Sequence, residues 1–160
     1  MSMARTFSAR SAATALFLSA LLFAAFALAE AQFTSDRMRL VTADNKIHEF
    51  TVELAIDADQ REQGLMFRRS MAPDHGMLFD FGDTRRVMMW MKNTYLALDM
   101  LFIDKSGTVR TIHQDAVPFS EAIIDSREPV AYVLELNAGT VKRLGIKPGD
   151  RLEGARIVGN

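Results

Sequence analysis

The run Val130-Ala131-Tyr132-Val133-Leu134-Glu135-Leu136 is the clearest buried strand in this 160-residue sequence. Apolar residues fill it almost without interruption, which is typical of a strand covered on both faces. Glu135 is its one charged residue, and strand alternation places its side chain on the face of Ala131 and Val133. The stretch therefore predicts a β-rich domain that carries a carboxylate on an apolar face.

Two β-hairpins are predicted on the N-terminal side of this strand, at residues 37–56 and 98–112. In the first, alternating apolar residues flank a turn that contains Asp44 and Asn45, two residue types that tolerate a positive φ. In the second, the connecting loop ends in Gly107, which can supply the left-handed residue of a bulged hairpin. Local sequence alone thus predicts four strands.

Two short helices are also predicted. The first begins after Asp57, whose side chain can cap it, while Gln60 completes the reciprocal bond and Gly64 ends the helix. The second follows residue 136, with Asn137 as the expected cap and Gly145 as the expected stop. Both are too short to be stable without packing against the rest of the domain.

Shorter apolar runs at residues 77–79, 87–91 and 151–158 predict further strands, and Lys147-Pro148-Gly149-Asp150 predicts a type II turn. About eight short strands with two short helices indicate a mainly β domain. We expect a β-sandwich or a partly closed barrel, with the helices at its edge.

Four blocks of this sequence resemble the motifs of the domain of unknown function 192 family, and they occur in the family's order. The four motif blocks are Gln60-Arg61-Glu62-Gln63-Gly64-Leu65-Met66-Phe67-Arg68, Gly76-Met77-Leu78-Phe79-Asp80-Phe81, Trp90-Met91-Lys92-Asn93-Thr94 and Tyr132-Val133-Leu134-Glu135-Leu136. The resemblance runs from about Glu49 to Glu153 and departs at Met89, where the family usually has an aromatic residue. It implies a small jelly-roll-like domain, commonly exported, with no established activity.

The first 29 residues have the pattern of a secretory signal peptide. Arg5 and Arg10 precede an apolar run at residues 16–29, which ends in Ala27-Leu28-Ala29. A membrane anchor is the alternative, and the run is short for one. We expect residues 1–29 to be removed and residues 30–160 to form one periplasmic or secreted domain, with no membrane span after cleavage.

Composition excludes several classes of function. Only two of the 19 basic residues lie in residues 1–29, whereas all 20 acidic residues lie in residues 30–160, so the expected mature part has a net charge of −3. No basic run exceeds two residues, which argues against nucleic-acid binding. The chain has no Cys, so disulfides and thiolate metal sites cannot form. Eight of the ten methionines fall in residues 30–160, and core packing is a commoner role for them than a thioether copper site. We expect no metal and no cofactor.

Glu135 is the most informative candidate residue, because an unpaired buried charge costs several kcal/mol or more. An ion pair with Arg61, Arg68 or Arg69 would make it structural. Without such a partner, it would face a ligand, act as an acid or base, or simply be exposed to solvent.

The segment Trp90-Met91-Lys92-Asn93-Thr94 holds the only Trp of the chain. An aromatic ring beside an amide, a cation and a carboxylate (Asp99) is typical of a site for a sugar or another small polar ligand. The alternative is that Trp90 packs in the core and Asn93 serves a turn.

We therefore predict an exported, non-catalytic domain that binds a small polar ligand or a cell-envelope carbohydrate. Its predicted ligand-binding residues are Arg61, Trp90, Lys92, Asn93, Asp99 and Glu135. No catalytic set is recognisable, although Asp80, Asp99 and Glu135 would make a carboxylate-dependent hydrolase if they converged. A protein–protein module of the envelope, marked by an exposed apolar patch, is the third hypothesis.

Overall fold

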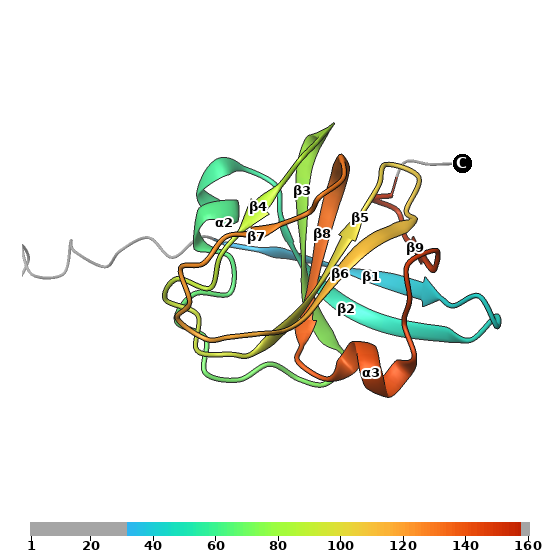
Figure 1. Ribbon diagram of the computed structural model, residues 1–160, viewed down its shortest axis with the longest axis horizontal. Helices are drawn as coiled ribbons and strands as arrows, with labels where there is room; N and C mark the ends of the chain where they lie inside the picture. The colour runs from blue at the N-terminus through green and yellow to red at the C-terminus, as the bar shows by residue number, and fades with distance from the viewer. Residues whose placement is uncertain (1–31, 158–160) are drawn as a thin grey trace, which may run out of the picture. The chain divides into compact units, whose positions relative to one another are not determined.

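The computed structural model describes residues 32–157, so the predicted signal peptide lies outside the described part of the chain. The domain is mainly β, as predicted (Figure 1). Its strands within this range are β1 (Thr34–Val41), β2 (Ile47–Ala55), β3 (His75–Arg85), β4 (Met88–Met89), β5 (Leu98–Ile103), β6 (Val109–Ala116), β7 (Ile124–Asp125), β8 (Val130–Asn137) and β9 (Arg151–Glu153). The helices are α2 (Ala58–Gln63) and α3 (Thr140–Leu144). None of the helices in residues 32–157 is long and apolar enough to cross a membrane.

Seven strands form one curled sheet in the order β6-β5-β8-β3-β2-β1-β9. The sheet curls until its last strand meets the start of its first, where Thr108 and Arg151 form a β-bridge. Two backbone hydrogen bonds reinforce this seam, from Leu152 N to Gly107 O and from Val109 N to Asp150 O, each 2.8 Å long. The partly closed barrel expected from the sequence is therefore the architecture that forms.

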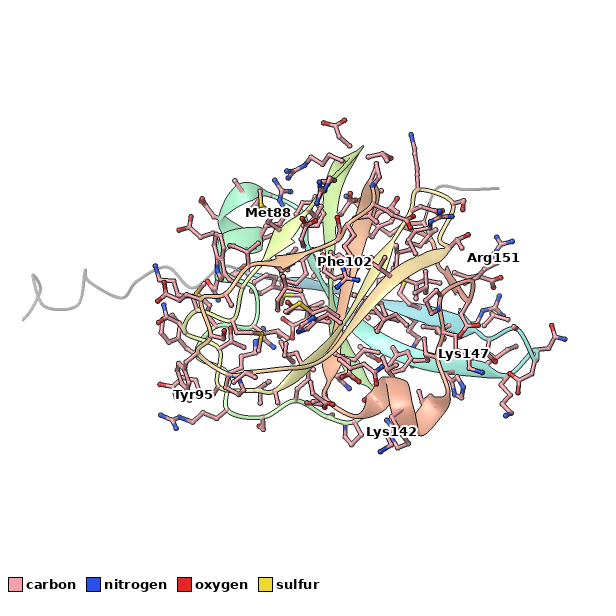
Figure 2. The ribbon with its side chains drawn as sticks, viewed as in Figure 1. Met88, Tyr95, Phe102, Lys142, Lys147 and Arg151 are labelled. Carbon is pink, nitrogen blue, oxygen red and sulfur yellow. The ribbon has the colours of Figure 1, made fainter. Side chains whose placement is uncertain are left out.

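The central strands β3, β8 and β5 are buried on both faces. Their inner face packs in the barrel interior, through residues such as Leu134 and Leu101. Their outer face carries a second apolar cluster, which includes Val133, Met100 and Phe102. Phe102 lies inside the protein, whereas Lys142, Lys147 and Arg151 project from its surface (Figure 2). Burial on two faces explains why residues 130–136 are almost entirely apolar.

The connection between β2 and β3 contains α2, which covers part of the outer face of the sheet. These two strands pair in parallel, so the chain must cross over between them, and α2 lies in that crossover. As predicted, Asp57 caps α2 by accepting from Gln60 N (2.8 Å), and Gln60 Oε1 accepts from Asp57 N (3.2 Å). Gly64 ends the helix. The two-stranded ribbon β4–β7 lies beside α2 (Figure 1).

Three predicted boundaries were wrong. The strand expected at residues 87–91 pairs only at Met88–Met89, and the strand expected at 151–158 pairs, as far as residue 157, only at Arg151–Glu153. Asn137 does not cap α3, because it is the last residue of β8 and its side chain donates to Met71 O (3.0 Å) and Ala72 O (3.1 Å).

Gly107 provides a test of the barrel seam. Its φ is +87°, and a Cβ there would lie 2.3 Å from Leu152 O, so Gly107→Ala adds a clash at the seam to the cost of a left-handed backbone. We expect the variant to lose more than about 2 kcal/mol of unfolding free energy, measured by denaturant titration. Gly82→Ala is the matched control, because Gly82 also has a positive φ (+74°) but open space around it. Equal losses in the two variants would contradict the seam.

A candidate binding pocket beside Glu135

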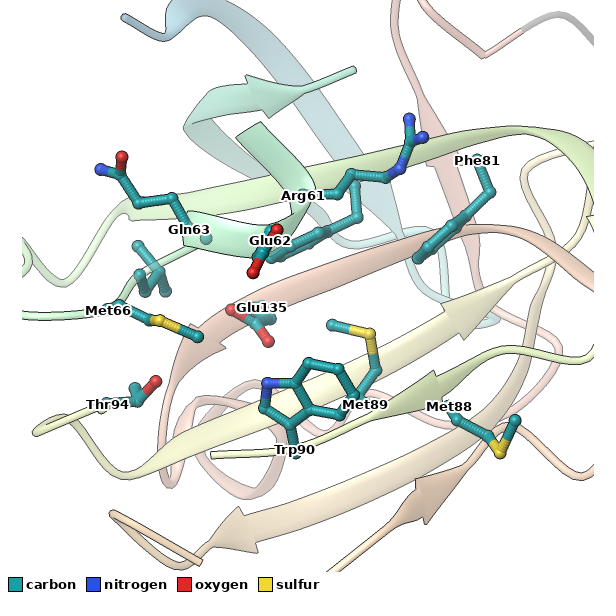
Figure 3. Close-up of a pocket in the computed structure, with 13 residues that line it drawn as sticks. Arg61, Glu62, Gln63, Met66, Phe81, Met88, Met89, Trp90, Thr94 and Glu135 are labelled. Atoms are coloured by element: carbon teal, nitrogen blue, oxygen red, sulfur yellow. The ribbon is translucent and has the colours of Figure 1, made fainter. Parts of the chain in front are cut away.

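A cavity of ≈ 310 Å³ lies on the outer face of the sheet, between the α2 segment and the β4 segment (Figure 3). Its size falls within the range of ligand pockets. Phe79 of β3 and Glu135 of β8 belong to the central strands of the sheet. The lining residues are Arg61, Glu62, Gln63, Gly64, Leu65, Met66, Phe79, Phe81, Met88, Met89, Trp90, Thr94 and Glu135.

Glu135 is the buried ionisable residue in the lining of this pocket. In the sheet Glu135 lies opposite Met77 of β3 and Met100 of β5, so its side chain projects from a face lined by apolar neighbours. Only 4% of the residue is exposed. Within residues 32–157 its carboxyl group has no hydrogen-bond or salt-bridge partner, and burial raises its pKa to about 8. The carboxyl group therefore stays largely protonated at neutral pH.

The ion pair considered for Glu135 does not form, because the three arginines have other partners. Arg68 makes a bidentate salt bridge with Glu53. Arg69 stacks over the Tyr95 ring, with its guanidinium carbon 4.7 Å from the ring centroid. Arg61 donates to the carbonyl oxygens of Ile56 and Asp80. The structural interpretation of Glu135 was wrong for the described part of the chain, and its carboxyl group faces the pocket.

Trp90 lines the pocket and is 46% exposed, so the alternative that it packs in the core was wrong. The buried residues near Trp90 in the chain are Val87 (1% exposed), Met91 (0%) and Thr94 (5%). Figure 3 shows the indole ring of Trp90 across the cavity from α2, beside Glu135. An aromatic surface and a carboxyl group thus share one hollow.

Arg61 is the third predicted residue that lines the pocket, and it forms part of the wall. Its guanidinium carbon lies 5.8 Å from the centroid of the Phe81 ring. Its hydrogen bonds to Ile56 O and Asp80 O tie α2 to β3. Figure 3 shows the guanidinium directed toward Phe81 and away from Glu135. The guanidinium of Arg61 therefore holds α2 against β3 and is not directed at Glu135.

Asn93 and Lys92 stand outside the cavity. Asn93 adopts a positive φ of 56° and accepts a hydrogen bond from Phe67 N (2.9 Å) through its backbone oxygen. Its side-chain nitrogen lies 3.8 Å from the Met66 sulfur, so it supports a lining residue without facing the hollow itself. Lys92 is exposed and is absent from the pocket lining.

Asp99 lies on the opposite face of the sheet from Glu135. Its neighbour Met100 is on the outer face, so alternation turns Asp99 toward the interior, where it is 0% exposed. It accepts hydrogen bonds from Asp115 N (3.0 Å) and Val141 N (2.8 Å), and the second of these supports the first turn of α3. Asp99 is therefore a structural residue.

The three carboxylates of the hydrolase hypothesis do not converge. Asp80 is bonded to Arg156 (2.9 Å), and Asp99 is held by backbone amides. Asp80 follows the outer-face residue Phe79, and Asp99 precedes the outer-face residue Met100, so alternation turns both carboxylates toward the inner face. Glu135 faces the pocket on the outer face.

Sequence reasoning missed the other lining residues, which are Glu62, Gln63, Gly64, Leu65, Met66, Phe79, Phe81, Met88, Met89 and Thr94. A signal was present, since every lining residue except Met88 and Met89 lies in the four motif blocks. The family-like segments, far apart in sequence, thus meet at this cavity.

The fold and the cavity define a small curled β-barrel domain with a ligand-sized pocket on its outer face. Residues 39–154 match the family DUF192, described as "Uncharacterized ACR", and the chain belongs to this family. No functionally curated protein is detectably similar to the chain.

Two crystal structures are similar to this chain. One is a protein from Sinorhizobium meliloti 1021, described as a candidate transcription regulator. It is 75% identical over 79% of this chain and 98% of its own, with a TM-score of 0.77. The other is a protein of unknown function from Novosphingobium aromaticivorans DSM 12444. It is 33% identical over 79% of this chain and 89% of its own, with a TM-score of 0.71.

Proposed function

We propose that this chain is an exported binding domain that holds a small polar ligand, or one unit of a cell-envelope carbohydrate, in the pocket beside Glu135. The observation that carries the proposal is the carboxyl group of Glu135, which is buried, faces the cavity and has no partner in residues 32–157. A ligand that donates to this carboxyl group would supply the hydrogen-bond partner that residues 32–157 do not provide.

Trp90 supports the same function. Its exposed indole offers a flat apolar surface at the wall of the cavity, where the ring of a sugar or the apolar part of another ligand can stack. Phe79, Phe81 and the methionines complete an apolar lining around a few polar groups, a composition common in ligand pockets. Binding without catalysis fits the dispersal of Asp80, Asp99 and Glu135.

The location is part of the proposal and rests on the sequence of residues 1–29. N-terminal sequencing of the protein recovered from the periplasm or the medium should begin at Glu30, and recovery only from the cytoplasm would contradict export. We propose no nucleic-acid partner, because residues 30–160 carry a net charge of −3 and no basic run longer than two residues.

Trp90 makes the binding function directly measurable, because it is the only Trp in the chain. We expect a compound among sugars, cell-wall fragments, amines and organic acids to change its fluorescence and to raise the melting temperature. A ligand at 100 times its Kd adds about 2.7 kcal/mol of stability. Recovery of the compound unchanged, checked by NMR, distinguishes binding from turnover.

Trp90→Ala is expected to weaken binding at least about tenfold, from the loss of the stacking surface. Lys92→Ala is the matched control, since Lys92 is two residues away, exposed and outside the pocket. Both variants are compared by calorimetry, which does not depend on the indole. Equal affinities in Trp90→Ala, Lys92→Ala and the unaltered protein would overturn the assignment of this pocket.

A further inference from the structure

The geometry points to a small organic cation as the ligand, an ammonium group on an apolar body, with its charge on the carboxylate of Glu135 and its body against Trp90. This inference rests on the proposed binding function and names the class of ligand. It follows from three features of the pocket: the charges that face it, the groups that surround Glu135, and the shape of its apolar walls.

The first feature is an excess of acidic groups. The charged residues that line the cavity are Arg61, Glu62 and Glu135, so the lining holds two carboxyl groups and one guanidinium group. The guanidinium of Arg61 is already bonded to Ile56 O and Asp80 O and lies along the Phe81 ring. Figure 3 shows Glu62 on the α2 side of the cavity and Glu135 below it. An anionic ligand would meet two carboxyl groups, and the guanidinium of Arg61 is directed away from Glu135.

The second feature is the neutral surroundings of Glu135. Met77 from β3 and Met100 from β5 flank it on the sheet, and neither carries a charge. From the other elements around the cavity, Phe79, Phe81, Met88, Met89, Trp90 and Thr94 are neutral, and Arg61 and Glu62 of α2 are the charged groups. A carboxylate in such a site gains most from a partner with a full positive charge.

The third feature is the chemistry of the walls. The faces of aromatic rings attract cations, and tryptophan attracts them most strongly. Thioether sulfurs are soft and polarisable, and Met66 and Met89 place theirs near Glu135 and Trp90 (Figure 3). An alkylammonium ion can place its charge between these groups and the Glu135 carboxylate, while its apolar part displaces water from the walls.

Binding should release a proton. Burial raises the pKa of Glu135 to about 8, so most molecules hold the proton at pH 7 and must lose it to form the ion pair. Alkylammonium groups stay protonated in this range, as lysine does. Affinity for the cation should therefore rise about tenfold per pH unit below pH 8 and level off above it.

The test uses three probes of matched shape: phenethylamine as the cation, 2-phenylethanol as the neutral analogue and 3-phenylpropionate as the anion. Each is titrated into the mature protein at pH 8.5 and at pH 6 while Trp90 fluorescence is recorded. We expect phenethylamine to bind roughly tenfold more tightly than 2-phenylethanol at pH 8.5, with the advantage reduced at pH 6. Glu135→Gln should abolish the advantage, whereas Glu121→Gln, at an exposed site outside the pocket lining, should retain it.

The outcomes separate this inference from the proposed function. If 2-phenylethanol or N-acetylglucosamine binds and phenethylamine binds no more tightly, the cation inference is overturned and a binding pocket remains. If phenethylamine binds Glu135→Gln as well as it binds the unaltered protein, the inference is also overturned. If neither these probes nor the wider panel alters fluorescence or melting temperature, both proposals fall.

Discussion

Glu135→Gln is expected to make the folded domain more stable at pH 8, by about 3–5 kcal/mol. The carboxyl group has a pKa of about 8 in the folded protein against an ordinary value of 4.5, because burial disfavours its charge. At pH 8 the unfolded chain ionises it freely, while the folded chain must either hold a proton or bury a charge. Glutamine has the same size and remains neutral, so the variant avoids this cost.

The pH dependence has a definite sign. The folded state binds its proton more tightly than the unfolded state does, so the contribution of Glu135 to stability is greatest below pH 4.5. It declines as the pH rises from 4.5 to about 8 and is constant above that. Unfolding free energies, measured by denaturant titration at pH 5, 6, 7 and 8, should therefore converge for Glu135→Gln and the unaltered protein at low pH and diverge at high pH.

Glu62→Gln is the control for this experiment, since Glu62 lines the same pocket but is exposed. It should change stability by less than about 0.5 kcal/mol. A destabilised Glu135→Gln at pH 8 would show that the carboxylate has a stabilising partner in the protein. A gain in stability with a loss of ligand affinity is expected of a residue retained for binding.

Asp99→Asn is expected to have the opposite effect and to lose about 3–5 kcal/mol of stability. Asp99 is fully buried and accepts from Asp115 N and Val141 N at 3.0 and 2.8 Å. Asparagine keeps the size, but its amide nitrogen would face a backbone N–H that also donates. Denaturant titration measures the loss, and faster hydrogen exchange at the Val141 amide should accompany it.

Asp83→Asn serves as the control, because Asp83 is exposed, and it should leave stability within about 0.5 kcal/mol of the original. At a temperature where Asp99→Asn is still folded, its affinity for ligand should match that of the unaltered protein. If Asp99→Asn bound ligand more weakly but kept its stability, Asp99 would belong to the binding site, which would contradict its structural role.

The elements predicted well from sequence are those that neighbouring residues determine. The capping box of Asp57 and Gln60, the turn with Asn45 at a φ of 61° and the loop that ends in Gly107 all form as local chemistry predicts. The prediction that Asn137 caps α3 was wrong because its side chain instead donates hydrogen bonds to Met71 O and Ala72 O, which are distant in sequence. The parallel pairing of β2 with β3 and the seam of the barrel depend on distant segments, and no local signal encodes them.

The site was predicted in part for the same reason. Glu135 and Trp90 could be chosen because a carboxylate in an apolar strand and a lone Trp are unusual in themselves. Asp99 was predicted in the site, but the β5–β8 register pairs Met100 with Glu135, which leaves Asp99 on the opposite face of the sheet. A register shifted by one residue would turn Asp99 toward the pocket. Sequence spacing does not fix that register. Lys92 was grouped with Trp90 because both belong to one short segment, but β4 ends at Met89 and Lys92 lies outside the pocket lining.

The most direct test of this account is a pH titration of the Glu135 carboxyl group by NMR, in protein labelled with ¹³C at the glutamate carboxyl carbons and assigned by comparison with Glu135→Gln. We predict a midpoint near pH 8 in the free protein, falling when phenethylamine is added. A midpoint near 4.5, the ordinary value, would show that the carboxylate is solvated or paired within the protein. It would contradict the claim that the group is buried without a partner and is available to bind a ligand.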